Sequence, residues 1–431
     1  MMVSRCRLRV LLAAAFVAYC GRLDAQPAQD AASARAIRGE IDQLKQDFDA
    51  RLSALESRLA ALEGRQPTTA EPPSTAAQTA AATPQPVADG SGAVPNSGGA
   101  GAGSKIFNPD MAVIGTFLGV AGKNAVNPLP ALALPESEVS LQAVVDPYAR
   151  ADFFLSFGEE GVAVEEGYLT FPTLPGGLLM KVGRQYAAFG KANTLHSHIL
   201  PWADRPLALA NLVGGDEPMA DAGISVARLI PNPWLFLEAT GQVFRGDGGV
   251  FHSSQRRDLS YVGHVRGYQD LSESTNVDFG ASYAYGHNNS GVANDIDLGR
   301  FTTSLFGVDG TIRWRPLQRA IYNSFLGRGE VIWSRRGQPF EDNQTASGFY
   351  LSGDYQFGRR WFAGLRFDRS ERAEDSAASD RGQSLVLTYR PSEFSQVRGQ
   401  LRRTKYAEGE TANEFLFQFQ FAIGAHGAHP F

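Results

Sequence analysis

The sequence predicts an all-β fold: a transmembrane antiparallel β-barrel of about 16 strands, preceded by an N-terminal coiled-coil helix and a disordered linker. Three observations predict it. Apolar and polar residues alternate in strand-length segments through 106–431, the first residues resemble an export signal, and the chain ends on the aromatic strand 415–421 and on Phe431. Alternation is expected because a barrel strand meets lipid on one face and the lumen on the other.

Residues 1–25 are arranged like a cleavable secretory signal peptide. Basic residues precede an apolar run over 10–20, and Ala25 is a small residue at the expected cleavage point. The run is shorter than the roughly twenty residues that a membrane-spanning helix needs. Both cysteines, Cys6 and Cys20, lie in this segment, so the exported chain would have no thiol for a disulfide, catalysis or a metal. An export signal before a barrel indicates the outer membrane of a Gram-negative cell.

Residues 26–64 are predicted to form a periplasmic helix. Apolar residues recur at steps of three and four between Ile37 and Leu62, as on one helix face. A single helix cannot bury so narrow a stripe, so we interpret it as a self-associating coiled coil, most simply a trimer. The alternative is a helix lying against the barrel or on peptidoglycan. Residues 65–105 are rich in Ala, Pro, Thr, Gly and Ser without periodicity, which predicts a flexible, disordered linker.

Residues 106–431 are predicted to form the barrel. In one clear strand, Phe279, Ala281 and Tyr283 alternate with Asp278 and Ser282. Short turns are expected at 146–147, 172–177, 231–233, near 318, at 358–359 and at 391–392, and longer loops at 121–137, 188–220, 245–257, 287–299, 337–345 and 371–382. Short turns on one rim and long loops on the other are usual in such barrels. A barrel of this size encloses an aqueous lumen.

The longest loop, 189–220, follows the fifth predicted strand and provides the candidate functional residues. A loop of this length without regular structure is usually functional or disordered. We favour a loop that folds inward and narrows the pore; an extracellular flap is the alternative. The candidate constriction residues are Lys191, His196, His198, Asp204 and Arg205, a mixture of charges suited to filtering rather than to one reaction.

Two groups of short stretches resemble known porins. VGRQYAAFGK at 182–191, His-Ser-His at 196–198 and Asp-Arg-Pro-Leu at 204–207 resemble porins related to the phosphate-selective type. The Phe-Asn-Pro-Asp opening at 107–110 and the GAHGAHPF ending from Gly424 resemble uncharacterised porin-like outer-membrane proteins, some labelled as zinc-regulated receptors. The resemblance implies that the long loop narrows the lumen, and that Phe431 belongs to the signal read by the barrel-assembly machinery.

Strand alternation also places charged side chains on the lumen face. They are Arg313, Arg315, Arg328, Arg366, Arg398 and Arg402, with Asp278, Asp309, Glu330, Asp354 and Asp368. Opposed basic and acidic strips would create a transverse field that orients small polar solutes. The same residues could instead form ion pairs that hold one another in place. The balance of signs predicts no ion selectivity, although the resemblance to phosphate-selective porins favours anions.

The sequence offers little support for a metal site or for catalysis. His196 and His198 would share one side of a strand, a usable spacing for zinc, and His426 and His429 form a second pair. We assign no metal site and no cofactor, because two imidazoles without a third ligand bind weakly and the exported chain has no cysteine. We also predict no enzyme, because the remaining histidines have no signature serine segment near them.

The sequence therefore favours a porin that allows passive diffusion of small polar or ionic solutes, with outer-membrane lipids and lipopolysaccharide around a homotrimer. A structural anchor that reaches the cell wall and peptidoglycan through the coiled coil is the alternative. A metal- or TonB-related receptor fits less well, because TonB-dependent importers carry a folded plug and about 22 strands. The formal net charge of −5 argues against a nucleic-acid partner.

Overall fold

The computed structural model describes residues 43, 46 and 109–424, except 160, 294–295, 298 and 341–342. The predicted signal peptide, the linker, the C-terminal histidine pair and Phe431 lie outside these residues. So does the predicted coiled coil, apart from Gln43 and Gln46, which are helical. No helix in the described part of the chain is long and apolar enough to cross a bilayer.

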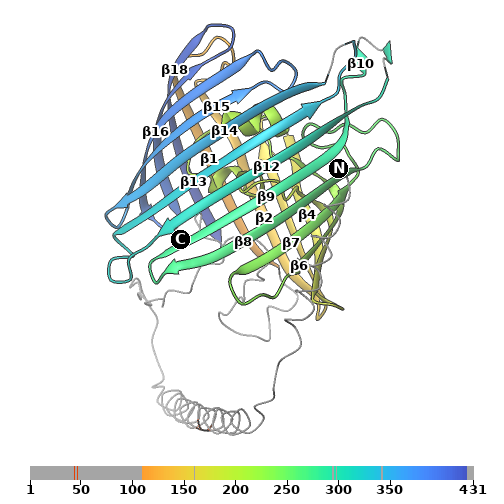
Figure 1. The fold of residues 1–431 in the computed structure, drawn as a ribbon. Helices are drawn as coiled ribbons and strands as arrows, with labels where there is room; N and C mark the ends of the chain where they lie inside the picture. The colour runs from red at the N-terminus through yellow and green to blue at the C-terminus, as the bar shows by residue number, and fades with distance from the viewer. Residues whose placement is uncertain are drawn as a thin grey trace, which may run out of the picture. The chain divides into compact units, whose positions relative to one another are not determined.

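Within the described residues, sixteen antiparallel strands close into one barrel (Figure 1), which confirms the predicted all-β fold and strand number. Each strand pairs with its neighbours along the chain, and β1 pairs with β18 to complete the ring. The strands are β1 (Asp110–Lys123), β2 (Leu132–Asp146), β3 (Ala149–Gly158), β4 (Gly161–Leu174), β5 (Leu178–Tyr186), β6 (Ala220–Leu229), β7 (Phe236–Phe244), β8 (Ser260–Ser272), β9 (Thr275–Asn288), β12 (Phe301–Trp314), β13 (Asn323–Arg336), β14 (Gln344–Phe357), β15 (Trp361–Glu371), β16 (Ser379–Ser392), β17 (Ser395–Lys405) and β18 (Thr411–Gly424). A two-stranded hairpin, β10 (Val292–Ala293) with β11 (Ile296–Asp297), lies in the connection before β12.

The strands expose apolar side chains on the outside and bury polar ones inside. On β18, the Phe417 and Phe419 side chains are 39% and 38% exposed, whereas Gln420 is 0% exposed. At the rim of short turns, the exposed aromatic residues include Tyr148, Trp234, Tyr322 and Trp361. Aromatic residues favour the membrane–water interface, and a closed barrel pairs its own backbone groups. The barrel is therefore built to span a bilayer.

Three predicted loops are longer than the loops in the structure. β2 begins at Leu132 rather than after 137, β14 at Gln344 rather than after 345, and β16 at Ser379 rather than after 382. These strand ends are polar or contain proline, so alternation does not reveal them. Pairing with the adjacent strand extends them nonetheless, as where Asp380 lies opposite Ser370.

An apolar core lies inside the barrel, on the side where the segment between β5 and β6 packs against the wall. Phe189, Leu209 and Leu212 of this segment are at most 1% exposed and belong to one buried cluster with Leu305 and Ile332 of the strands. The lumen therefore contains a folded, packed segment rather than water alone.

The outward orientation of Leu387 in β16 leads to a stability prediction. Leu387 is 46% exposed and lies opposite Ala363 and Gly399, well away from both strand ends. We expect Leu387→Arg to lower the free energy of unfolding in lipid vesicles by about 2–4 kcal/mol, because it places a charge in the apolar band. Gln383→Arg is the control and should cost about 0–1 kcal/mol, because the exposed residues Arg381 and Gln383 are already polar and mark the end of the apolar band on this face. If urea titrations give equal unfolding free energies for wild type and Leu387→Arg, this face of β16 does not meet lipid.

Candidate functional site: the loop inside the barrel

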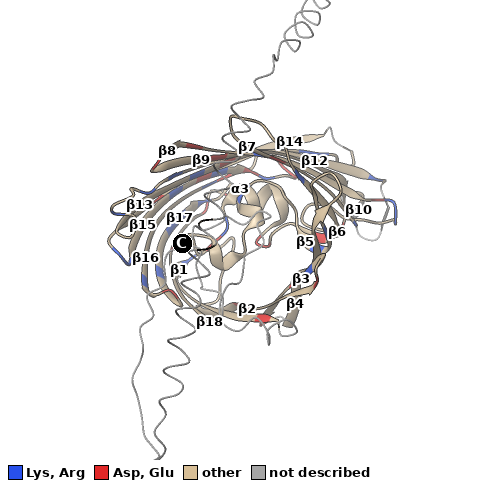
Figure 2. Ribbon diagram, turned by 90° about the horizontal axis from the view of Figure 1, so that it is seen from below, with Lys and Arg blue, Asp and Glu red and all other residues tan. Residues whose placement is uncertain are grey.

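Residues 187–219, here called the inward loop, enter the barrel instead of forming an extracellular flap. Figure 2 looks along the barrel and shows this segment, with α3, inside the ring of strands. It contains four short helical turns: η1 (Ala192–Thr194), η2 (Ser197–Ile199), α3 (Leu207–Leu209) and the π-helical turn η3 (Ala210–Gly214). The five candidate constriction residues all belong to it.

The start of the inward loop is held by Glu330 of β13. The Glu330 Oε1 atom accepts hydrogen bonds from the backbone N–H groups of Lys191, at 3.0 Å, and Ala192, at 2.6 Å, and from the Tyr350 hydroxyl at 2.9 Å. Gly190 turns the chain here with φ +64°, and an added Cβ would lie 2.4 Å from Glu330 Oε2. Glycine is thus required by both the backbone conformation and the close approach of the carboxylate. The Lys191 ammonium lies 3.6 Å from Asp278 Oδ2 on β9.

The middle of the inward loop is held by arginines from β15 and β17. Asp204 Oδ2 accepts from Arg366 at 2.9 Å and from Arg402 at 3.1 Å. Arg398 donates to the Trp202 carbonyl oxygen at 3.1 Å. The Arg366 guanidinium also lies 4.8 Å from the centre of the Trp202 ring, so a cation–π contact adds to the ion pair.

The electrostatics of Asp204 follow from these contacts. Burial by itself raises the pKa of the carboxyl, but the charges of Arg366 and Arg402 outweigh burial and lower the pKa from 3.8 to about 2. Arg205, the next residue, donates to Asn193 Oδ1 at 3.4 Å, and burial lowers the pKa of its guanidinium. Asp204 therefore anchors the loop as a carboxylate.

Of the remaining predicted lumen charges, some form ion pairs inside the barrel and others lie near the short-turn rim. Arg328 and Asp354 face inward and lie 3.8 Å apart, and Asp368 pairs with Arg366 at 2.8 Å. Arg313 is on the inward face near the end of β12, whereas Arg315 lies one residue past the strand and is exposed at the short-turn rim. Much of the predicted basic strip is therefore engaged in ion pairs, which favours the interpretation that these residues hold one another and the inward loop in place.

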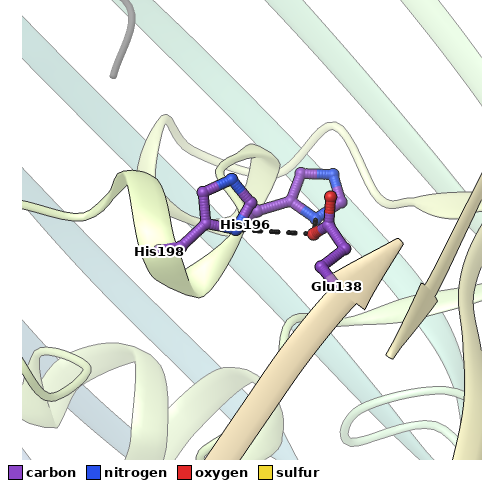
Figure 3. Close-up of side chains that lie close together, drawn as sticks. All are labelled: Glu138, His196 and His198. Carbon is purple, nitrogen blue, oxygen red and sulfur yellow. Dashed lines mark ion pairs between the residues drawn. The ribbon is translucent and has the colours of Figure 1, made fainter. Parts of the chain in front are cut away.

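His196 is the residue before η2 and His198 lies within it. Figure 3 shows both imidazole rings beside Glu138, which projects from β2. Glu138 Oε2 lies 2.9 Å from His196 Nδ1 and 3.4 Å from His198 Nδ1. Burial lowers the pKa of His196, but the neighbouring carboxylates of Glu138, Glu165 and Glu166 outweigh burial and raise the pKa well above 6.5. The structure thus brings together the two histidines of the His-x-His motif with acidic residues that the sequence interpretation had not singled out.

Local strand geometry explains why these carboxylates meet. Glu136 and Glu138 are two apart on β2, so both point inward. Glu165 and Glu166 are adjacent, yet both side chains are 11% exposed and reach His196. The pairing of β3 with β4 shifts here, from Phe154 opposite Glu166 to Leu155 opposite Val164, so Glu165 is the extra residue of a β-bulge. Bulges re-aim side chains in this way, and no signal in a single sequence reveals one.

Comparison with curated proteins relates the chain to a protein of similar sequence. An uncharacterised protein of Aquifex aeolicus (strain VF5) is 31% identical over 332 residues, which cover 68% of this chain and 69% of the relative. This chain belongs to the same family as that protein. No family model matches it.

Comparison with solved structures shows which known fold the barrel resembles. OprB of Pseudomonas putida, in its high-pH structure, aligns with a TM-score of 0.53 at 11% identity, over 73% of this chain and 94% of that chain. An anion-selective porin of Comamonas acidovorans aligns with a TM-score of 0.49 at 12% identity, over 73% and 98% of the two chains. At this identity the likeness to OprB shows the fold alone: the barrel has the porin fold.

The pKa of Asp204 gives a prediction about acid stability. Because the pKa is lowered on folding, the charged carboxylate stabilises the fold above pH 4, and this stabilisation is lost as the pH falls towards 2. We expect Asp204→Asn to lower the unfolding free energy at pH 6 by at least about 2 kcal/mol. The difference from wild type should shrink by about 2 kcal/mol between pH 5 and pH 2.

Urea titrations of both proteins in detergent at pH 6, 4 and 2 would check this dependence. Asp375→Asn, in the connection between β15 and β16, is the control for loss of an aspartate and should unfold like wild type. If the difference in unfolding free energy between wild type and Asp204→Asn does not vary with pH, the charged Asp204 carboxylate does not stabilise the fold as assigned.

Proposed function

We propose that the protein is an outer-membrane porin through which small polar or ionic solutes diffuse passively. The observation that carries the proposal is a segment of the chain folded inside a closed barrel whose outer face is apolar. A sixteen-stranded barrel is wide enough for an aqueous channel, and a lumen segment sets the size of what passes. The predicted export signal supports location in the outer membrane.

The inward loop is proposed to narrow the pore. Its anchors lie on widely spaced strands: Glu330 on β13, Arg366 on β15, Arg402 on β17 and Glu138 on β2. A segment fixed at several points around the wall keeps its position during permeation, as a size filter requires. The charges that line it would orient solutes with a dipole or a charge.

The proposal includes a homotrimer and no catalytic step. The helical stripe within 26–64 supports association, because a narrow apolar face is buried when identical helices pack together. Lipid and lipopolysaccharide would contact the outer face, where the aromatic side chains of β18 are exposed.

Planar bilayer recordings of the folded protein test the proposal. We expect discrete conductance steps in groups of three, with a reversal potential across a salt gradient that gives the preferred ion sign. A folded barrel without conductance would refute the porin, and a plugged receptor or a cell-wall anchor would then account for the fold better.

A loop variant tests the constriction separately. Replacement of residues 192–214 by a short Gly-Ser linker should increase single-channel conductance, because it removes η1 to η3 from the lumen. Replacement of the hairpin segment 291–299, which carries β10 and β11, is the matched control and should leave conductance unchanged. Equal conductance of wild type and the inward-loop variant would show that the segment does not limit the flow.

A further inference from the structure

The wall behind η2 contains a dense group of acidic and imidazole side chains, here called the Glu/His cluster. Its members are Glu136 and Glu138 of β2, Glu165 and Glu166 of β4, and His196 and His198 of the inward loop. Glu138, His196 and His198 are each at most 8% exposed. Burial of several carboxylates close together is unfavourable unless positive charge is supplied.

The strands supply little of that charge. Glu138, Glu165 and Glu166 form ion pairs with the histidines, and Glu136 accepts a hydrogen bond from the Ser197 hydroxyl. In the described part of the chain, none of these four carboxylates forms an ion pair with a lysine or an arginine. The buried Oε2 atom of Glu138 lies between the Nδ1 atoms of the two imidazoles, but neither contact has the geometry of a hydrogen bond. A buried polar atom without a hydrogen bond calls for an explanation, and a bound ion is one such explanation.

The spacing of the nearest atoms suits a metal ion. One imidazole nitrogen each of His196 and His198 and a carboxylate oxygen of Glu138 all lie within 4.8 Å of one another. The Nδ1 atoms of His196 and His198 lie 2.9 and 3.4 Å from Glu138 Oε2. Two ligands that are each about 2 Å from a tetrahedral zinc ion lie about 3.3 Å apart. Glu165 Oε2, 3.0 Å from His196 Nδ1, is near enough to provide a fourth ligand.

The second nitrogen of His196 is oriented as a metal-binding histidine requires. Its Nε2 lies 3.1 Å from Glu166 Oε2, so an N–H at Nε2 would donate to Glu166 and leave Nδ1 for the metal. A carboxylate partner on the far nitrogen is common in zinc sites and fixes the ring. Tyr186 donates to Glu165 Oε2 at 2.7 Å and so orients that carboxylate as well. The β-bulge at Glu165 allows both β4 carboxylates to take part.

We propose that the Glu/His cluster binds one divalent transition-metal ion of the Zn²⁺ type, with His196, His198 and Glu138 as ligands and Glu165 in the fourth position. The ion ties the inward loop to β2 and β4, on a different part of the wall from the arginines that hold Asp204. Two imidazole ligands select such an ion over Ca²⁺ or Mg²⁺, which prefer oxygen alone.

Zinc titration of the folded protein against a chromophoric chelator tests the site without any conductance measurement. We expect one Zn²⁺ per chain, retained in excess Ca²⁺. Glu138→Gln and His198→Ala should each weaken binding at least about tenfold, since each removes a ligand. Retention of heat-modifiable migration on a gel would confirm that each variant is folded.

Two controls separate the cluster from other histidines. His252→Ala removes a half-exposed loop histidine, whose Nδ1 lies 3.3 Å from Asp247, and should leave the affinity unchanged. The double variant His426→Ala/His429→Ala should also keep one Zn²⁺ per chain. Absence of stoichiometric zinc in the wild type, displacement by equimolar Ca²⁺, or loss of zinc in either control would overturn the proposal.

Discussion

The constraint on which this structure depends is that every backbone N–H and C=O group inside a bilayer must find its partner within the protein. The pairing of β1 with β18, from Ala112 opposite Gly424 to Lys123 opposite Asn413, satisfies this constraint by removing the last open edge. Closure of the barrel then determines which face of each strand is apolar and which is polar. One face of each strand meets lipid, so the other face must contain the polar side chains.

A polar interior creates a second requirement, because charged groups at low exposure need partners. The inward loop meets much of it. Asp204 lies between Arg366 and Arg402, and Glu330 accepts two backbone N–H groups from the loop. The lumen charges that would act on solutes are therefore also those that hold the inward loop in place. The two interpretations of these charges, as a field across the pore and as structural ion pairs, are compatible.

The two sides of the lumen hold the inward loop by different means. Arginines from β15 and β17 bind a loop carboxylate and a loop carbonyl oxygen, whereas carboxylates from β2 and β4 face loop histidines. The first kind of contact is insensitive to anything but strong acid, because arginine stays charged. The second kind comprises the ligands of the proposed metal site.

The sequence by itself determined the barrel, because the period of two that places Phe417 outside and Gln418 inside is a local property of the strand. It also placed the long loop after the fifth strand and identified Asp204, Arg366 and Arg402 as lumen residues. It could not show that these three meet, because Asp204 is separated from Arg366 by 162 positions and from Arg402 by 198.

Only the tertiary structure decided the surroundings of His196 and His198. Glu138 comes from a strand more than fifty residues earlier, and Glu165 points inward because of a bulge that no alternation pattern records. A regular strand would place the adjacent residues Glu165 and Glu166 on opposite faces, so alternation predicts that only one of them reaches the lumen. Contacts between distant segments depend on register and closure, which are properties of the whole sheet.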